Sequence, residues 1–164
     1  MTIFFRKYTE SDFETLVCCM EKLNDSVAAT DPLGRSRRLS AFGERYTAKL
    51  ITKISQNSGL ILFACDRKKV VGCVAGIIER QTRDNLLECV PTRAGRVLEL
   101  YVKLGYRNRS IGTQLMKRME EYFIENECDV VKVEVFKPNR KAHKFYHQLD
   151  YQDRIVDLMK LLKH

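Results

Sequence analysis

The chain has 164 residues, a formal net charge of +8 at pH 7 and 45% apolar and 30% charged residues. This length predicts one domain, residues 1–164, in which folding buries about 70% of the extended chain's surface, and the composition excludes disordered, collagen-like and low-complexity proteins. The longest uncharged apolar run, residues 70–78, is far shorter than the ~20 residues of a membrane-spanning helix. We therefore expect no membrane partner.

The first half of the chain predicts a strand, two helices and a hairpin. Residues 3–6 form a short strand, and Ser11 opens a capping-box pattern before apolar residues at helical spacing up to Leu23. A loop at 24–38 precedes a second amphipathic helix, whose apolar residues run from Leu39 to Ile54 and which Gly59 can end. Further predicted elements are an antiparallel hairpin of residues 60–65 and 70–78, then a polar loop at 81–95.

The second half predicts a strand at 97–102, a helix beginning near Ile111 and a strand at 130–136. A strand, a helix and a strand in succession indicate two parallel strands with a right-handed crossover. A short helix after Pro138 and a last strand at 154–159 complete the order βααβββαβαβ. The predicted fold class is α/β, with a mixed (α+β) sheet and helices on its faces.

Residues 107–113, Arg-Asn-Arg-Ser-Ile-Gly-Thr, lead from the strand at 97–102 into the next helix. Free backbone N–H groups and the positive end of the helix dipole meet at such a point, and two arginines with Lys103 add full charges. Gly112 lets the backbone approach an anion, and Ser110 can cap the helix and donate its hydroxyl. The segment suits a diphosphate, although alone it is also an ordinary solvated helix start.

A second segment follows the next strand: residues 139–146, Asn-Arg-Lys-Ala-His-Lys-Phe-Tyr. Together the two segments resemble the GNAT N-acetyltransferase superfamily. The first is similar to its pyrophosphate loop, Gln/Arg-x-x-Gly-x-Gly/Ala, with Arg107 first, Ser110 replacing the first glycine and Gly112 last. The second is similar to its Asn-x-x-Ala-x-x-Phe-Tyr helix. Asp150 departs from the family's Leu-Gly-Phe/Tyr corner after that helix.

The resemblance implies a GNAT-like acyl-CoA N-acyltransferase fold in which the two parallel strands splay apart around the pantetheine arm of acetyl-CoA. It further implies transfer of the acetyl group to a primary amine by direct attack in a ternary complex, without a metal. The coenzyme-binding residues that it implies are Leu100, Tyr101, Val102, Arg107, Asn108, Arg109, Ser110, Ile111, Gly112, Thr113, Asn139 and Tyr146.

Direct attack requires a base, because an alkylamine with a pKa of about 10 is almost wholly protonated at neutral pH. Glu99, on the strand that borders the thioester, is the first candidate, with Glu79 and Glu88 in reserve; Glu99 can equally be a solvated or ion-paired strand residue. Tyr146 suits the general acid, because a phenol can protonate a departing thiolate of similar basicity. Its alternative role is packing beside Phe145.

Two histidines, His143 and His147, have metal-ligand spacing, but no carboxylate or cysteine is expected nearby, so we predict surface residues and no metal. The six cysteines form no Cys-x-x-Cys pair, which favours free thiols. The N-terminus has no signal-peptide pattern, which predicts a cytoplasmic protein.

Two other functional classes remain open: an acyl-CoA-binding domain without catalysis and a basic nucleic-acid-binding module. Nucleic acid is not expected, because the basic residues border the coenzyme site and no nucleic-acid motif is present. The loops at 24–38 and 79–96 each carry one excess positive charge, which favours an acceptor amine that bears a carboxylate or phosphate, or a protein amine. Both a monomer and a homodimer fit the sequence.

Overall fold

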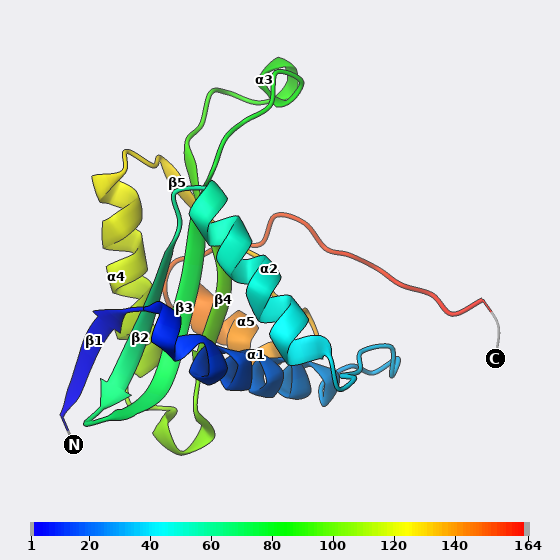
Figure 1. The fold of residues 1–164 in the computed structure, drawn as a ribbon. Helices are drawn as coiled ribbons and strands as arrows, with labels where there is room; N and C mark the ends of the chain where they lie inside the picture. The colour runs from blue at the N-terminus through cyan, green and yellow to red at the C-terminus, as the bar shows by residue number, and fades with distance from the viewer. Residues whose placement is uncertain (1, 163–164) are drawn as a thin grey trace.

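The structure, a computed structural model, describes residues 2–162. Its sheet has five strands in the order β1-β2-β3-β4-β5 (Figure 1). The first four strands pair antiparallel and β4 with β5 pairs parallel. The predicted β2–β3 hairpin and the predicted parallel pair are therefore confirmed. The strands are β1 (Ile3–Lys7), β2 (Leu60–Asp66), β3 (Lys69–Glu79), β4 (Ala94–Val102) and β5 (Val130–Val133).

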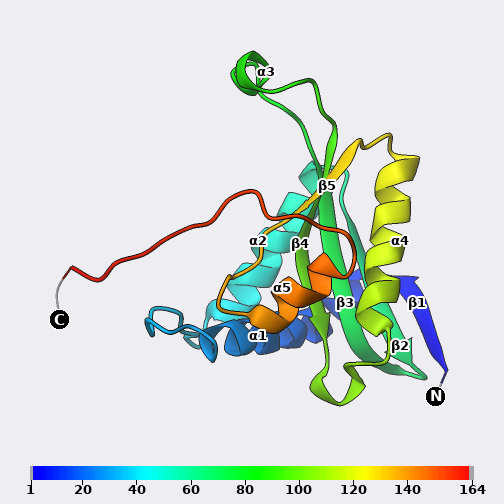
Figure 2. The ribbon, with the colours of Figure 1, turned by 180° about the vertical axis from the view of Figure 1, so that it is seen from behind.

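Four helices cover the two faces of the sheet, and a fifth, α3, lies on a projecting loop (Figures 1 and 2). The helices are α1 (Phe13–Ala28), α2 (Phe42–Gln56), α3 (Asn85–Glu88), α4 (Ile111–Glu125) and α5 (Arg140–His147). The apolar sides of α1 and α2 pack on one face of the sheet, and those of α4 and α5 pack on the other. In the described part of the chain, no helix is both long and apolar enough to cross a membrane.

Close packing of α4 on the sheet depends on a glycine in β4. A Cβ atom on Gly95 would overlap the ring of Phe123, a fully buried residue of α4. The missing side chain lets the helix lie directly against the strand. This contact fixes α4 within the β4-α4-β5 crossover that carries the motif at 107–113.

The start of α1 differs from the predicted capping box at Ser11. The box is formed instead by Thr9 and Asp12 around a 3-10 turn, η1 (Glu10–Asp12), that leads directly into α1. The Asp12 carboxylate accepts hydrogen bonds from the Thr9 backbone N–H and hydroxyl at 2.9 and 2.8 Å. Arg6 of β1 binds the same carboxylate through both terminal nitrogens at 2.7 Å. The Arg6 hydrogen bond holds the pKa of buried Asp12 well below its usual range. The cap is therefore selected by an ion pair from β1, a tertiary contact.

The other differences concern the loops and the C-terminal part. Helix α1 continues to Ala28, into the predicted loop, and the loop at 81–95 contains α3. Strand β5 ends at Val133 rather than 136, and the predicted strand at 154–159 is wrong, since that segment is exposed and has no regular structure. Its apolar residues come in pairs rather than alternating, so it has no single apolar face with which to pack as a strand.

Candidate active site

Strands β4 and β5 are hydrogen-bonded only along the first half of β4 and are parted along its second half. Their pairing covers residues 94–97 and 130–133, whereas β4 continues to Val102 and keeps only β3 as its partner. The three predicted backbone-binding residues, Leu100, Tyr101 and Val102, all lie in this parted half. The splayed strands expected from the sequence are therefore present, and they leave an edge of β4 facing the gap.

A β-bulge in β4 determines where Glu99 points. Neighbouring residues of β3, Ala75 and Gly76, pair with Glu99 and Val97, so Leu98 is an extra residue in β4. In a regular strand Val97 and Glu99 would face the same side. Because of the bulge, Val97 packs in the core beneath α4, whereas Glu99 bonds to α2 on the opposite face.

Glu99 is mostly buried and accepts a short hydrogen bond from the hydroxyl of Tyr46 in α2. Burial raises the pKa of Glu99 above its ordinary value, against the opposing effects of the Tyr46 hydrogen bond and the Lys53 charge. Burial also raises the pKa of Tyr46, with a further contribution from the Glu99 charge. A carboxylate with a raised pKa that is still anchored by one donor suits a general base.

Tyr146 is 8% exposed and packs with the core under α4. Its ring meets those of Phe145 and Tyr151 at centroid distances of 5.2 and 5.6 Å. Burial raises the pKa of its phenol, and the negative charge of Glu99 raises it further. The phenol therefore holds its proton at neutral pH, and it lies close enough to the candidate base Glu99 to be affected by the charge of that carboxylate.

The loop before α4 has an unusual backbone. Asn108 and Ser110 both adopt left-handed conformations, with φ of 59° and 57°, and alternation of this kind turns successive backbone N–H groups to one side. Ser110 is the N-cap of α4, but its side chain makes no capping hydrogen bond, so this part of the prediction is wrong. The Arg107 side chain donates to the carbonyl of Val102 at 3.0 Å, which ties the loop to the end of β4.

The two departures from the family motifs have one structural explanation. Ser110 and Asp150, each standing where the family pattern has glycine, have φ of 57° and 64°. The backbone thus keeps the conformation that glycine adopts without strain, although the side chains differ.

We expect Ser110→Gly and Asp150→Gly each to stabilise the fold by about 0.5–1 kcal/mol, because relief of left-handed strain exceeds the entropy cost of glycine. Urea unfolding measures this. Exposed Thr113→Gly in α4 is the matched control, and it should destabilise by about 0.3 kcal/mol because its backbone is helical and glycine is a slightly poorer helix former than threonine. A loss of stability in both test variants would contradict the explanation.

The remaining predicted site residues have mixed roles. Ile111 is buried in the core, so only its backbone can face a ligand, whereas Thr113 and Arg109 are exposed. Asn139 caps α5, its side-chain oxygen accepting from the backbone N–H of Ala142 at 3.2 Å. A Cβ atom on Gly112 would lie 3.4 Å from Phe145, so the glycine leaves space between α4 and α5.

The reserve carboxylates are poorly suited as bases. Burial raises the pKa of Glu79, but hydrogen bonds and charges from Arg96 and Lys132 outweigh it, and the pKa lies below its ordinary value. Glu88 is exposed on α3, which projects from the body of the molecule (Figure 1). Glu99 therefore remains the best placed carboxylate.

Tyr46 is the residue that sequence analysis missed. It stood within the apolar stripe of the second predicted helix, and in the structure its ring stacks on Phe42 at 5.1 Å while its hydroxyl binds Glu99. A signal existed, because a buried tyrosine hydroxyl needs a polar partner. The sequence could not say which partner.

Because the Tyr46 hydroxyl lowers the pKa of Glu99, Tyr46→Phe should raise it. If Glu99 acts as a base, which requires its ionised form, the acidic limb of the kcat/KM profile should then move to higher pH. A pH profile of the wild type and the variant measures the shift, and stacking on Phe42 is retained. An acidic limb that does not move would remove Glu99 from the role of base.

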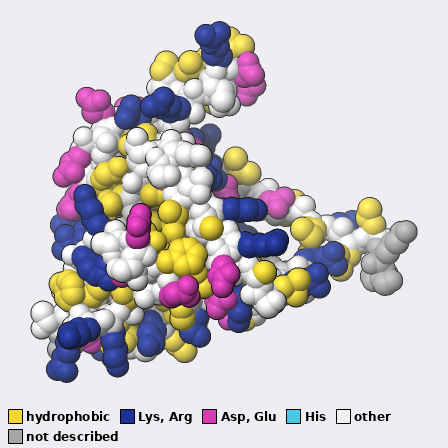
Figure 3. All heavy atoms as spheres, in the orientation of Figure 1, with side chains coloured by type: hydrophobic (Ala, Val, Ile, Leu, Met, Phe, Trp, Pro, Cys, Tyr) yellow, Lys and Arg dark blue, Asp and Glu magenta, His cyan; other side chains and the backbone are white. Residues whose placement is uncertain are grey.

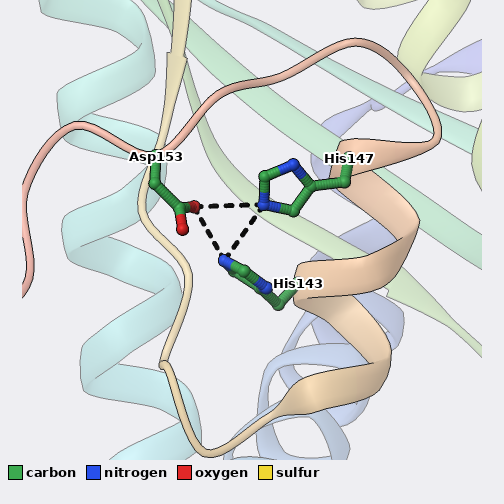
Figure 4. Close-up of side chains that lie close together, drawn as sticks. All are labelled: His143, His147 and Asp153. Atoms are coloured by element: carbon green, nitrogen blue, oxygen red, sulfur yellow. Dashed lines mark hydrogen bonds and ion pairs between the residues drawn. The ribbon is translucent and has the colours of Figure 1, made fainter.

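The prediction that no carboxylate lies near the two histidines is wrong. Asp153, in the segment after α5, lies against His143 and His147 (Figure 4). Its Oδ1 is 2.7 Å from Nε2 of His143 and 3.2 Å from Nε2 of His147. His143 and His147 lie on α5, and Asp153 lies in the segment that follows it.

Basic side chains do not form one continuous band on the face seen in Figure 3, where lysines and arginines are scattered among acidic and apolar residues. Two features that a nucleic-acid footprint usually has, a stripe of one sign and a recognised motif, are thus missing on that face and in the sequence.

Residues 27–151 match the model of the acetyltransferase (GNAT) family. A protein of Methanocaldococcus jannaschii, described as an uncharacterized N-acetyltransferase, is 36% identical over 61 residues, which are 37% of this chain and 39% of that protein. The matched segment is thus well under half of that relative.

Solved structures share the fold over nearly all of the chain. One is AAC(6')-Iy in complex with the bisubstrate analogue CoA-S-monomethyl-acetylneamine, with a TM-score of 0.72, 11% identity and coverage of 98% of this chain and 99% of that chain. Another is glucosamine-6-phosphate N-acetyltransferase from Arabidopsis thaliana, with a TM-score of 0.69, 14% identity and coverage of 99% and 100%. Because the family model matches most of the sequence, this chain belongs to the GNAT family of acetyltransferases.

Proposed function

We propose that this protein transfers an acetyl group from acetyl-CoA to a primary amine. The observation that carries the proposal is the parted edge of β4, which has Glu99 at one side and Tyr146 of α5 at the other. These two residues are close enough for the charge of Glu99 to raise the pKa of the Tyr146 phenol. A base and a neutral acid beside one gap are the two groups that direct aminolysis of a thioester needs.

The coenzyme would use backbone groups first. In this proposal the amides of pantetheine pair with the β4 edge at residues 100–102, where β5 has ended. The pyrophosphate lies at residues 107–113, where the start of α4, two left-handed residues and two arginines favour an anion.

In the chemical step, Glu99 accepts a proton from the amine, directly or through one water molecule. The amine nitrogen forms a bond to the thioester carbonyl carbon, the carbon–sulfur bond breaks, and the nitrogen releases its second proton to solvent as the amide forms. Tyr146 gives its phenolic proton to the departing thiolate and is reprotonated from solvent. The raised pKa of Glu99 favours its role, because the carboxylate binds a proton more strongly. The raised pKa of Tyr146 keeps the phenol protonated until the thiolate departs, although it makes the donation itself less favourable than for an ordinary phenol.

The acceptor that fits best carries a negative charge beside its amine. The two aspartates of residues 24–38 are already engaged: Asp25, near the end of α1, pairs with Arg38 at 2.7 Å, and Asp31, in the loop before α2, accepts three backbone hydrogen bonds. Arg35 and Arg37 are exposed in the same loop. The plant relative acts, by its name, on glucosamine-6-phosphate, an amine of this charge type. A protein amine is the alternative.

Two measurements test the proposal. Acetyl-CoA should stabilise the protein against thermal unfolding, by about 2.7 kcal/mol at one hundred times Kd. Mass spectrometry should then detect acetylated product in a panel of amino acids, amino sugar phosphates, polyamines and peptides. Absence of a thermal shift at millimolar acetyl-CoA would contradict coenzyme binding. A shift without any turnover would favour an acyl-CoA-binding domain without catalysis.

A further inference from the structure

Three side chains near the end of α5 bring their ligand atoms together. Nε2 of His143 and Nε2 of His147 are 3.2 Å apart, and Oδ1 of Asp153 is 2.7 and 3.2 Å from them (Figure 4). Within residues 2–162, no other group of three histidine, cysteine or acidic side chains meets the same spacing.

The fold fixes this triangle from both sides. The histidines are four residues apart on one helix, so they share a face. After α5 the chain turns back at left-handed Asp150, and the Tyr151 backbone N–H donates to the Tyr146 carbonyl at 3.1 Å. The Tyr151 hydroxyl donates to Glu120 of α4 at 2.8 Å. Asp153 is therefore held two residues from an anchored tyrosine.

The separations match those of a metal site. A tetrahedral ion with bonds of about 2.0–2.1 Å to nitrogen and oxygen has ligand atoms about 3.3 Å apart. Two of the three observed distances lie within about 0.1 Å of this value, so small side-chain rotations suffice for the third. Asp153 is 49% exposed and His143 24% exposed, which leaves an entry path and room for water as the fourth ligand.

We propose that His143, His147 and Asp153 form a binding site for a divalent transition metal ion of the zinc type. Two imidazoles and one carboxylate are a ligand set for zinc, copper, nickel or cobalt, whereas magnesium and calcium require mainly oxygen ligands. The site would be structural, because none of its three side chains is among the residues assigned to the coenzyme or to the chemical step. The bound ion would tie the segment after α5 to the helix that carries Tyr146.

The ammonium group of Lys137 lies within the proposed site. Nζ of Lys137 is 3.2 Å from Nε2 of His143 and 3.4 Å from Oδ2 of Asp153. Its ammonium group would compete with a cation by charge repulsion and by binding the carboxylate. The side chain is 56% exposed and can move into solvent. Removal of the Lys137 ammonium group should therefore tighten metal binding. A cluster held only by hydrogen bonds would instead lose a partner and gain nothing.

Equilibrium dialysis with Zn²⁺ tests the proposal on the full chain without coenzyme or amine, so its outcome is independent of catalysis. One ion should bind per chain, and Asp153→Asn and His147→Ala should each weaken binding at least tenfold. Lys137→Ala should tighten it several-fold, while Lys141→Ala, which removes the same charge from an exposed position of α5, should have much less effect.

Cobalt distinguishes this site from a cysteine site. Bound Co²⁺ should show the visible absorption of tetrahedral coordination without a thiolate-to-cobalt charge-transfer band. Circular dichroism and urea unfolding check that the variants are folded, which is expected because Asp153 and His147 are exposed. Equal Zn²⁺ affinity in wild type, Asp153→Asn and His147→Ala, or a thiolate band in the cobalt spectrum, would overturn the proposal.

Discussion

Tyr146→Phe should lower kcat by about 10²-fold to 10⁴-fold while the Kd for acetyl-CoA barely changes. Phenylalanine keeps the ring in the core and removes the phenolic proton that the departing thiolate receives. Within the described residues this hydroxyl has no side-chain hydrogen-bond partner, so little folding energy depends on it. Measurement of kcat with any accepted amine, checked by single turnover, and of Kd by titration separates the two effects.

Tyr122→Phe is the matched control for loss of a tyrosine hydroxyl. Tyr122 donates to the Ser58 carbonyl at 2.8 Å on the α4 side of the sheet. Its replacement should cost about 1 kcal/mol of stability and leave kcat unchanged. A Tyr146→Phe variant whose chemical step slows less than threefold would show that Tyr146 is core packing and that another group supplies the proton.

Gly112→Asp should reduce coenzyme affinity at least 100-fold. Repulsion between two unit charges about 4 Å apart near a protein surface is about 4 kcal/mol, and the pyrophosphate carries more than one charge. The fold should tolerate the change, because the nearest atoms to a Cβ at this position are 3.4 Å away or more. An acidic residue in the first turn of α4 also stabilises the helix through its dipole.

Gly112→Asn separates charge from size, because asparagine has almost the shape of aspartate without its charge. Titration of both folded variants with CoA should give a much larger loss for aspartate than for asparagine. Equal losses would mean that Gly112 provides space rather than an uncharged approach to an anion. Unchanged affinity in both would place the pyrophosphate elsewhere.

The sequence by itself was enough for the features that depend on neighbouring residues. Apolar spacing gave α2 and α4 to within a few residues, and the polar turn at 66–69 gave the β2–β3 hairpin. The succession of strand, helix and strand gave the parallel pairing of β4 with β5. These features follow from local periodicity and from the handedness of crossovers, which act within a short stretch of chain.

Only the tertiary structure decided which groups meet. The direction of Glu99 depends on the extra residue Leu98, because a bulge reverses the alternation that a sequence pattern assumes. Its contact with Tyr46 joins residues 53 positions apart. Asp153 reaches the histidines because the chain turns at Asp150 in a conformation that a non-glycine residue rarely adopts. Such contacts are set by register and backbone irregularity, which depend on the packing of the whole sheet and its helices.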